Sequence, residues 1–270
     1  MDLLQTIIIS IIQGMIEWLP ISSQGNIIIL MSEVFDYNIE NALKLSIILH
    51  LGTVMSASIY FRKEIIQITT NLKNYKIGYN NEINSLTTFV ILSTISSSII
   101  GLILFSSLLE IAENVFFTAI IGAGLIITGI LQKTIKSDLR NTKNLSHDIS
   151  IITGILQGFA VIPGISRSGI TTSYLLVRKF NPSTALRLSF IMSIPAVLLA
   201  NLYVLLFEGI QDLQYIELII AIMFSCISGL ISISSFIKIA QKIKFWIFSI
   251  IIGTLILIPY LFEIISQNII

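Results

Sequence analysis

Gln13-Gly14-Met15-Ile16-Glu17-Trp18-Leu19-Pro20-Ile21-Ser22-Ser23-Gln24-Gly25 returns later in the chain as Gln157-Gly158-Phe159-Ala160-Val161-Ile162-Pro163-Gly164-Ile165-Ser166-Arg167-Ser168-Gly169. Gln, Gly, Ile, Ser and the final Gly recur at one fixed offset of 144 residues. Each copy carries one ion that the other lacks, Glu17 in the first and Arg167 in the second. Both ions lie among apolar residues, and an ionisable side chain inside a membrane is costly and marks function. The duplication therefore predicts a site built from two related halves.

The composition indicates a multi-pass protein of the cell membrane. The chain has 270 residues, of which 54% are hydrophobic and 11% charged, whereas a soluble domain carries about 25% charged residues. Its mean hydropathy is +0.92. The single cysteine, Cys226, excludes an internal disulfide and a cysteine-based metal site. No pattern typical of nucleic-acid binding is present, so we expect the bilayer and a lipid as partners and allow for a homodimer.

The charges are segregated along the sequence. Fourteen of the sixteen Lys and Arg residues fall into four clusters. These are Arg62, Lys63, Lys73 and Lys76; Lys133, Lys136, Arg140 and Lys143; Arg178, Lys179 and Arg187; and Lys238, Lys242 and Lys244. The acidic clusters are Glu33, Asp36 and Glu40; Glu110 and Glu113; and Glu208, Asp212 and Glu217. By the positive-inside rule the basic loops are cytoplasmic and the acidic loops face outward.

The charge pattern predicts six spans and two hairpins. About 20 apolar residues cross a bilayer, and six segments connect opposite sides: 45–61, 87–107, 115–132, 184–207, 217–237 and 245–265. Residues 3–30 must begin and end outside, and residues 149–177 must begin and end inside. Each is too short for two spans and is broken by Pro and Gly in its middle. We therefore expect two re-entrant helical hairpins, one entering from each face.

The expected fold is an all-α polytopic membrane protein with an inverted-topology repeat. Residues 1–133 form the first repeat and residues 149–270 the second, with their boundary in the polar loop 134–148 and one shared membrane domain over 1–270. In such repeats the site lies near the midplane where the halves meet. The alternative is eight ordinary helices with a chance match of the two motifs, which would put at least one charge cluster on the wrong side.

The hairpin tips have the chemistry of an anion site. Pro20 and Pro163 suit a helix start because proline lacks the N–H that is unpaired there, so helices are expected from about Ile21 and Ile165. Free N–H groups and the positive end of the helix dipole bind anions. Hydroxyl donors and glycines that permit close approach surround this point: Ser22, Ser23, Ser166, Ser168, Thr171, Gly25 and Gly169.

The two ions define what the anion is. Arg167 presents a planar fork of donors suited to phosphate, so the site calls for a phosphate or diphosphate reached from within the bilayer. Glu17 is either a general base or Mg²⁺ ligand in phosphoryl transfer, or only the structural ion partner of Arg167. Gln13 lies one helical turn before Glu17, so it either shares a metal with that carboxylate or makes an ordinary interhelical hydrogen bond.

Two further residues within apolar segments carry weaker expectations. His50 is the only histidine in a predicted span, and it is either a packing residue or an accessory part of the site. Trp18 is expected to line the lipid or the path of an isoprenoid chain.

Both motifs resemble the signatures of the undecaprenyl-diphosphate phosphatases of the bacitracin-resistance type. Residues 13–25 match the first signature as Gln-Gly-x-x-Glu-x-Leu-Pro-Ile-Ser-Ser-x-Gly, and residues 163–171 match the second as Pro-Gly-Ile-Ser-Arg-Ser-Gly-Ile-Thr. Residues 49–53, 60–63 and 193–196 also look like that family. The similarity covers the full length, and the paired motifs are highly specific.

The resemblance implies a membrane hydrolase with six spans and two inverted re-entrant hairpins. It removes the terminal phosphate of a polyprenyl diphosphate and so recycles the lipid carrier for peptidoglycan and surface-glycan assembly. Carried onto this chain, the family's acidic residue is Glu17 and its nucleophilic or phosphate-binding serine is Ser23. Its phosphate clamp is Ser166 with Arg167, near Thr171. A divalent cation, usually Mg²⁺, comes with the resemblance.

One position departs from the family. Where the family has Gly-His after the double serine and one further residue, this chain has Gly25-Asn26. Asparagine can bind phosphate by hydrogen bonds but is neither acid nor base near neutral pH, and loss of general acid–base help costs about 10²–10⁴-fold in rate. Either Glu17 carries the proton, or His50 substitutes, or the protein is a weak or non-catalytic relative.

Hydrolysis of a polyprenyl diphosphate is the leading hypothesis, with Ser23 or a water as the nucleophile. Two alternatives remain open, a polyprenyl-phosphate transporter or flippase and a lipid-diphosphate-binding paralogue without activity. An inverted repeat with ions at the midplane suits alternating access equally well.

Overall fold

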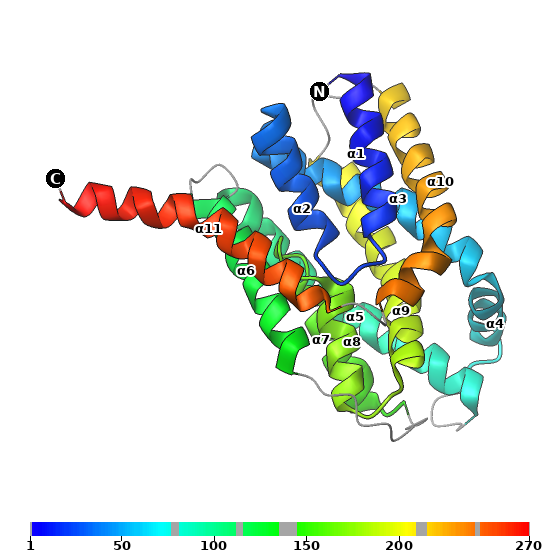
Figure 1. Ribbon diagram of the computed structural model, residues 1–270. Coiled ribbons are helices and arrows are strands. Elements are labelled where there is room, and N and C mark those ends of the chain that lie inside the picture. Colours follow the sequence, from blue (N-terminus) through cyan, green and yellow to red (C-terminus); the bar gives the residue numbers. More distant parts are fainter. Residues whose placement is uncertain are drawn as a thin grey trace.

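The computed structural model describes residues 2–76, 81–111, 116–134, 145–208, 215–240 and 244–269, which fold into helices with no strand among them (Figure 1). The α-helices are α1 (Leu3–Ile16), α2 (Ser23–Ile29), α3 (Ile39–Tyr60), α4 (Arg62–Leu72), α5 (Glu82–Ile111), α6 (Phe116–Thr134), α7 (His147–Phe159), α8 (Arg167–Val177), α9 (Pro182–Tyr203), α10 (Tyr215–Ala240) and α11 (Phe245–Ile269). A π-helical turn extends α2 (η1, Leu30–Val34) and another extends α9 (η2, Val204–Glu208). The predicted all-helical class is confirmed.

Several of these helices can cross a membrane. Within the described ranges, five are long and apolar enough to do so: Ile39–Tyr60, Glu82–Ile111, Phe116–Lys133, Pro182–Glu208 and Tyr215–Ile239. Leu3–Ile16 and Phe245–Pro259 are shorter apolar helices. The sixth predicted span, 245–265, falls in α11, which continues past Pro259 to Ile269. The protein is therefore a multi-pass membrane protein.

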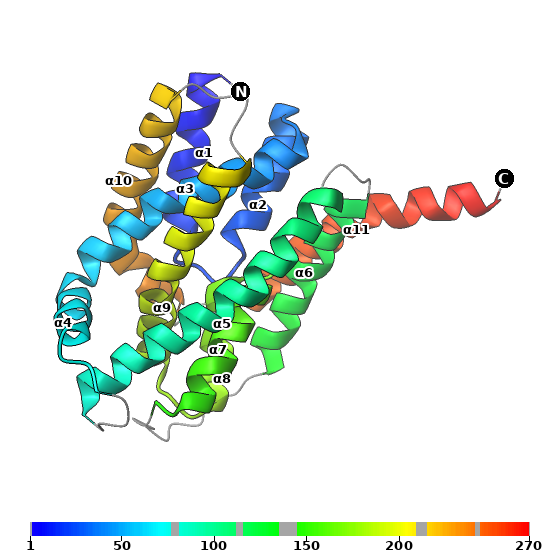
Figure 2. The same ribbon diagram turned by 180° about the vertical axis from the view of Figure 1, so that it is seen from behind.

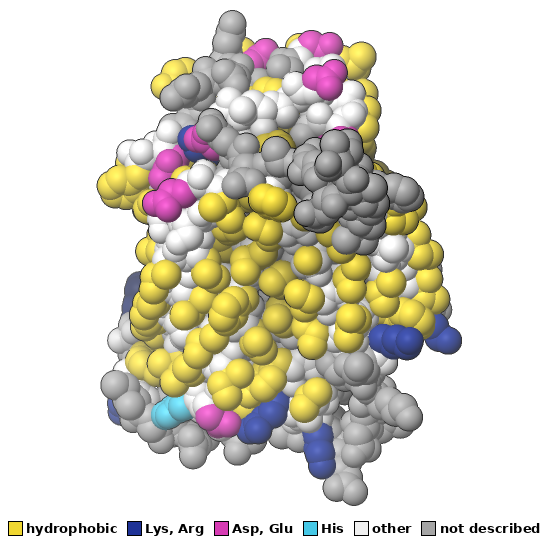
Figure 3. All heavy atoms as spheres, turned by 90° about the vertical axis from the view of Figure 1, so that its left-hand side faces the viewer, with side chains coloured by type: hydrophobic (Ala, Val, Ile, Leu, Met, Phe, Trp, Pro, Cys, Tyr) yellow, Lys and Arg dark blue, Asp and Glu magenta, His cyan; other side chains and the backbone are white. Residues whose placement is uncertain are grey.

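The surface shows the charge segregation expected of such a protein. In Figure 3 a broad apolar belt lies between an upper part that carries most of the visible Asp and Glu side chains and a lower part that carries most of the visible Lys and Arg side chains. Lys44, which belongs to no basic cluster, is paired with Glu40 through a 2.6 Å contact from Nζ to Oε1. Several members of the charge clusters lie outside the described residues: Glu113, Lys136, Arg140, Lys143, Asp212 and Lys242. So do residues 135–144 of the predicted boundary loop 134–148.

Two helix pairs are interrupted where the duplicated motifs lie. The first interruption, residues 17–22, separates α1 from α2, and the second, residues 160–166, separates α7 from α8. We call these the first tip and the second tip. The helices begin two residues after the predicted starts at about Ile21 and Ile165, because α2 begins at Ser23 and α8 at Arg167, and Pro20 and Pro163 both lie inside the tips. The helix starts are set instead by serine caps that follow the prolines.

Small residues let the interrupted pairs pack closely against long helices. Gly14 of α1 touches the backbone of Ser225 and Gly229 in α10, and Gly154 and Gly158 of α7 touch α5 at Ser93 and around residues 97–100. Such small-residue contacts bring helix backbones together in membranes. Figures 1 and 2 show α1 beside α10 and α7 beside α5 from both sides. The two tips are thus carried on two different helix pairs.

Trp18 is a core residue. Its side chain is buried, packs edge-on against Phe190, and donates from Nε1 to the Gly229 carbonyl and to Ser232 Oγ, both at 3.2 Å. The indole N–H thereby finds the partners that a buried donor requires. The prediction that Trp18 lines the lipid or the isoprenoid path is therefore wrong.

Candidate functional site

The two tips meet in the interior. Ser22 adopts a left-handed backbone (φ 59°), and its Oγ accepts hydrogen bonds from the N–H of Gly25 at 3.4 Å and from the N–H of Gly164 at 3.1 Å. A Cβ on Gly25 would overlap the backbone of Gly164, and Gly164 itself has φ +96°. Glycine is therefore needed at both positions, one for close approach and one for its conformation.

Serine caps start both helices that follow the tips. Ser22 is the N-cap of α2, and Ser166 is the N-cap of α8, where its Oγ accepts from the N–H of Gly169 at 3.1 Å. A capping hydroxyl satisfies one of the N–H groups that a helix start leaves unpaired. Since Ser23 and Arg167 are the first residues of their helices, their positions are fixed by these caps.

Glu17 is the centre of the site. Its Oε2 accepts hydrogen bonds from Ser23 Oγ at 2.6 Å and from Gln13 Nε2 at 3.1 Å, and it lies 3.1 Å from His50 Nε2. Its Oε1 lies 2.5 Å from Arg167 Nη2. The carboxylate is 6% exposed, and several of these contacts compensate its removal from water. The pair Glu17–Arg167 is the direct contact between the two tips' charged residues.

Arg167 is held on three sides. Besides Glu17, its Nη1 donates to the Ser189 carbonyl at 3.2 Å, and its Cζ lies 5.3 Å from the centre of the Phe190 ring. The Thr171 hydroxyl donates to the Arg167 carbonyl at 2.7 Å and shares a 2.7 Å hydrogen bond with Ser189 Oγ. A guanidinium has five N–H donors, so donors remain for an anion after these contacts.

His50 of α3 also belongs to the site. Its Nδ1 lies 2.6 Å from the Ser46 carbonyl oxygen and its Nε2 faces Glu17 Oε2. Both partners are hydrogen-bond acceptors, so only the doubly protonated ring satisfies both contacts. Such a ring places a second positive charge on the Glu17 carboxylate.

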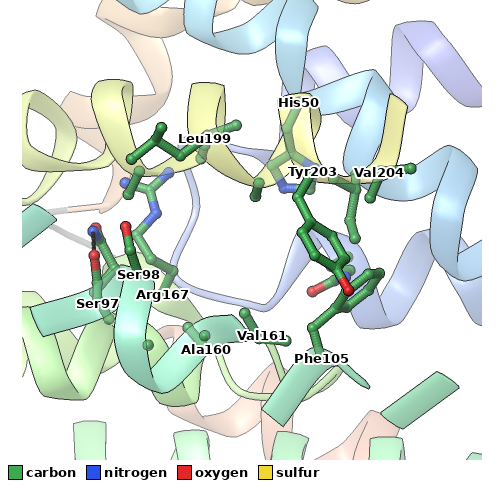
Figure 4. Close-up of a pocket in the computed structure, with 18 of the residues that line it drawn as sticks. His50, Ser97, Ser98, Phe105, Ala160, Val161, Arg167, Leu199, Tyr203 and Val204 are labelled. Carbon is green, nitrogen blue, oxygen red and sulfur yellow. Dashed lines mark hydrogen bonds between the residues drawn. The ribbon is translucent and has the colours of Figure 1, made fainter. Parts of the chain in front are cut away.

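A cavity of about 370 Å³ adjoins these residues. In Figure 4 Arg167, Ser97 and Ser98 lie at one end of it, and Phe105, Tyr203 and Val204 lie at the other. Several apolar lining residues are also exposed on the outer surface of the molecule: Leu102, Leu199, Leu202, Leu206 and Phe207. The cavity therefore reaches the membrane-facing surface between α5 and the α9–η2 helix.

The structure divides the sequence-predicted residues into two groups. Those that line the cavity are Glu17, Ser22, Ser23, Ser166, Arg167 and Ser168. Those placed behind its wall are Gln13, Gly25, Asn26, Gly169 and Thr171. Gln13 supports Glu17, Gly25 forms the contact between the tips, Gly169 packs beside Gln132, and Thr171 supports Arg167 and Ser189.

Asn26 has a local role in the first tip. Its Nδ2 donates to the carbonyl oxygens of Ile21 at 2.7 Å and Ser22 at 2.8 Å. Both amide hydrogens are thereby used on the backbone of the tip, where a helix break leaves carbonyl groups without helical partners. The Asn26 side chain is therefore bonded to the backbone of the first tip and does not line the cavity.

Sequence reasoning missed several lining residues. Gln157, Ser97 and Ser98 line the cavity, and Gln157 Nε2 donates to Ser97 Oγ at 3.2 Å. The signal for Gln157 was present, since it is the repeat partner of Gln13. Ser97 and Ser98 lie in a run of serines on an apolar helix, and only the packing of α5 against α7 shows which of them face the cavity.

The chain is similar to known proteins over nearly its whole length. The family model described as "Bacitracin resistance protein BacA" matches residues 6–257. A protein of Methanococcoides burtonii named undecaprenyl-diphosphatase is 41% identical over 262 residues, covering 94% of this chain and 97% of the relative. Proteins of the same name from Alkaliphilus metalliredigens and Haloarcula marismortui are 34% and 30% identical, covering 92% and 94% of this chain and 94% and 95% of the relatives.

Proposed function

The chain belongs to the bacitracin resistance protein BacA family, and we propose that it is an undecaprenyl-diphosphatase. It hydrolyses undecaprenyl diphosphate to the monophosphate and phosphate within the cell membrane. The reaction returns the lipid carrier to the assembly of cell-envelope glycans.

One observation carries this proposal. The Glu17 carboxylate contacts Ser23, His50 and Arg167 on the wall of a cavity whose far end is apolar and reaches the lipid-facing surface. A hydroxyl beside a carboxylate, and a guanidinium with free donors, suit phosphoryl transfer. The apolar end suits an isoprenoid chain, so the cavity fits a molecule with a phosphorylated head and an apolar body.

The finer architecture that we propose is six spans and two re-entrant hairpins in an inverted repeat, within a single membrane domain over 1–270. The repeats are 1–133 and 149–270, so α1–α2 corresponds to α7–α8, α3 to α9, α5 to α10 and α6 to α11. Helix contacts support this correspondence between the two repeats. In the first case α1 packs on α10 as α7 packs on α5, and in the second α3 packs on α10 as α9 packs on α5. The remaining large contacts, α6 with α11 and α3 with α9, join corresponding helices to each other.

The same topology places the cavity in the outer half of the membrane. Lining residues come from the middle of α3, at Ile47 and His50, and from the second halves of α5 and α9. Those halves lie toward Glu110 and Glu208, the acidic side that the positive-inside rule assigns to the exterior. The substrate therefore enters from the outer leaflet.

The residues divide the chemistry between them. A diphosphate carries more negative charge than one carboxylate, so it competes with Glu17 for Arg167 and frees Oε1. Ser23 Oγ then attacks the terminal phosphorus and gives its proton to Glu17, and the bridging P–O bond breaks as Glu17 passes that proton to the departing lipid monophosphate. A water next loses a proton to the regenerated Glu17 carboxylate and attacks the phosphorus on Ser23, and Glu17 returns the proton to Ser23 Oγ as phosphate leaves; direct attack by water on the substrate is the alternative. Ser166, Ser168 and the N-terminus of α8 hold the phosphoryl oxygens.

A divalent cation fits this site. Mg²⁺ is bound by one or two carboxylates together with phosphate oxygens and waters. On the cavity wall the described residues offer the Glu17 carboxylate, and they hold no cluster of three His, Cys, Asp or Glu side chains. The Gln13 Oε1 atom, which has no hydrogen-bond partner, is buried behind that wall. Glu17 would hold the cation, which would neutralise charge on the diphosphate.

Phosphate release by the purified protein tests the proposal. With a polyprenyl diphosphate and Mg²⁺ in detergent, we expect turnover that stops on chelation and falls by about 10²–10⁴-fold in Glu17→Gln, which loses the general base. Ser23→Ala should fall as far or further, and a phospho-enzyme should be trapped in single-turnover mixing if Ser23 is the nucleophile. Ser32→Ala is the matched control, since its hydroxyl bonds only within its own helix.

The rival functions give different results. Absence of phosphate release, together with translocation of labelled lipid across vesicles, would support the flippase instead. Asn26→His tests the departure from the family, and we expect no gain in rate because Asn26 lies behind the cavity wall. A higher rate of phosphate release in Asn26→His would show that a histidine at this position acts through a different conformation of the first tip.

A further inference from the structure

One face of α6 carries polar residues that the proposed chemistry does not use. Gly124, Thr128 and Gln132 follow one another at intervals of four residues on this apolar helix, so they lie along a single stripe. Gly124 abuts the backbone of the second tip at Pro163 and Gly164, where a Cβ would leave no room. Thr128 is 2% exposed. Neither Thr128 nor Gln132 lines the cavity.

Both side chains bind the backbone of a tip. Thr128 Oγ1 donates to the Gly164 carbonyl at 3.0 Å and accepts from the Ser166 N–H at 2.9 Å. Gln132 Nε2 donates to the Pro20 carbonyl at 2.5 Å. One helix therefore contacts the second tip through Thr128 and the first tip through Gln132, one turn apart.

These backbone groups need side-chain partners. A break in a helix leaves N–H and C=O groups without helical hydrogen bonds, and the bilayer interior supplies no water to replace them. Ser166 directly precedes Arg167, and Pro20 lies three residues before Ser23. The hydrogen bonds from α6 thus hold the two backbone segments that lead to Arg167 and to Ser23.

We propose that Thr128 and Gln132 are positioning residues, which fix the register of the two tips and so hold Arg167 against Glu17 and Ser23. This inference rests on the proposed phosphatase function for its kinetic consequence. Among the described residues, the tips and the helices that follow them are linked directly by the Ser22–Gly164 hydrogen bond, the Gly25–Gly164 contact and the Glu17–Arg167 pair. The Glu17–Arg167 pair is what the substrate competes for, so a third element is needed to keep the tips in place during turnover.

The test compares Thr128→Val with Thr128→Ser in the full-length protein. Valine keeps the shape of threonine but removes both hydrogen bonds, whereas serine keeps the hydroxyl. A displacement of about 1 Å at a reacting centre costs about 10²-fold in rate, so we expect kcat of Thr128→Val to fall by about 10–100-fold with little change in KM. Thr128→Ser should recover most of the activity.

Two further variants complete the design. Gln132→Met keeps the length of the side chain and removes its single bond to the first tip, and it should also lower kcat. Thr254→Val on α11 is the matched control, because the Thr254 hydroxyl bonds only to Ile250 of its own helix and is exposed. If Thr128→Val fails to fold, Gln132→Met decides the question alone.

Hydrogen exchange measured by mass spectrometry separates this inference from the proposed function. Thr128→Val should accelerate exchange in residues 160–169, and Gln132→Met in residues 17–25, whereas Thr254→Val should leave both segments unchanged. Unaltered exchange and kcat in Thr128→Val and Gln132→Met would overturn the inference even if the wild type is active. If the wild type releases no phosphate but Thr128→Val and Gln132→Met accelerate exchange as described, the phosphatase function is refuted and the positioning role stands.

Discussion

At the scale of single residues, the site is organised around one buried carboxylate. Glu17 faces two basic side chains, Arg167 and His50, and two neutral donors, Ser23 and Gln13. A carboxylate in a water-poor interior needs such compensation. The same contacts align Ser23 for attack, so the interactions that stabilise the ion also build the reactive geometry.

Removal of the guanidinium should therefore affect stability as well as turnover. Arg167→Ala leaves Glu17 buried without its partner from the second tip, and breaking a buried ion pair costs about 3–5 kcal/mol. Unfolding of the purified protein in mixed micelles should show this loss. Arg167→Lys keeps the charge but not the planar fork, so it should recover stability more than activity; equal recovery of both would argue against a role in binding the phosphate.

At the scale of elements, the tips depend on backbone contact more than on side chains. Gly25 touches the Gly164 backbone, and Gly164 holds a left-handed conformation against the Ile121 carbonyl of α6. The prolines that the sequence analysis placed at helix starts lie inside the tips, while Ser22 and Ser166 start the helices. The crossing of two interrupted helices is therefore a packed joint with no space for an added methyl group.

Gly25→Ala tests that joint. The new Cβ would overlap backbone atoms that cannot rotate away, and overpacking typically costs about 1–3 kcal/mol. We expect a lower melting temperature and a reduced rate of hydrolysis. Gly101→Ala is the control for stability, since its Cβ would meet only a Val161 methyl group at an ordinary 3.4 Å; an equal loss of stability there would mean that the crossing has no special tightness.

At the scale of the whole molecule, the proposed inverted topology predicts on which side of the membrane each chain segment ends. The segments on either side of the first tip both end outside, and those on either side of the second tip both end inside. Ordinary spanning helices in place of either hairpin would move one end across the bilayer. The charge distribution in Figure 3 agrees with one acidic and one basic side of the membrane domain.

Cysteine labelling in intact cells checks these sides. In a Cys226→Ala background, Asp2→Cys and Glu33→Cys should react with an impermeant maleimide, whereas His147→Cys and Arg178→Cys should react only after the membrane is permeabilised. The native Cys226 is buried, so its replacement should have little effect on the accessible sites. Labelling of Arg178→Cys from outside would exclude the second re-entrant hairpin.

Sequence alone reached the helical class, the membrane location and the family, because hydropathy, charge segregation and two specific motifs are local properties of the chain. It also predicted that Glu17 and Arg167 converge, and the structure places them 2.5 Å apart. It misplaced Trp18 and set the helix starts two residues early, because burial and capping depend on which partner approaches. It left His50, Gln13 and Asn26 with open roles.

Those roles were decided only by tertiary structure. A side chain's function in this site depends on the direction in which a neighbouring helix presents it: Asn26 turns to its own backbone, His50 turns to Glu17, and Thr128 of α6 reaches the second tip. Hydrogen bonds act over about 3 Å, whereas Glu17 and His50 lie 33 positions apart in the chain, and Thr128 and Gly164 lie 36 apart. The pattern of residue types predicts the two halves of the site, but only the packing of the helices brings the supporting residues within hydrogen-bonding distance of them.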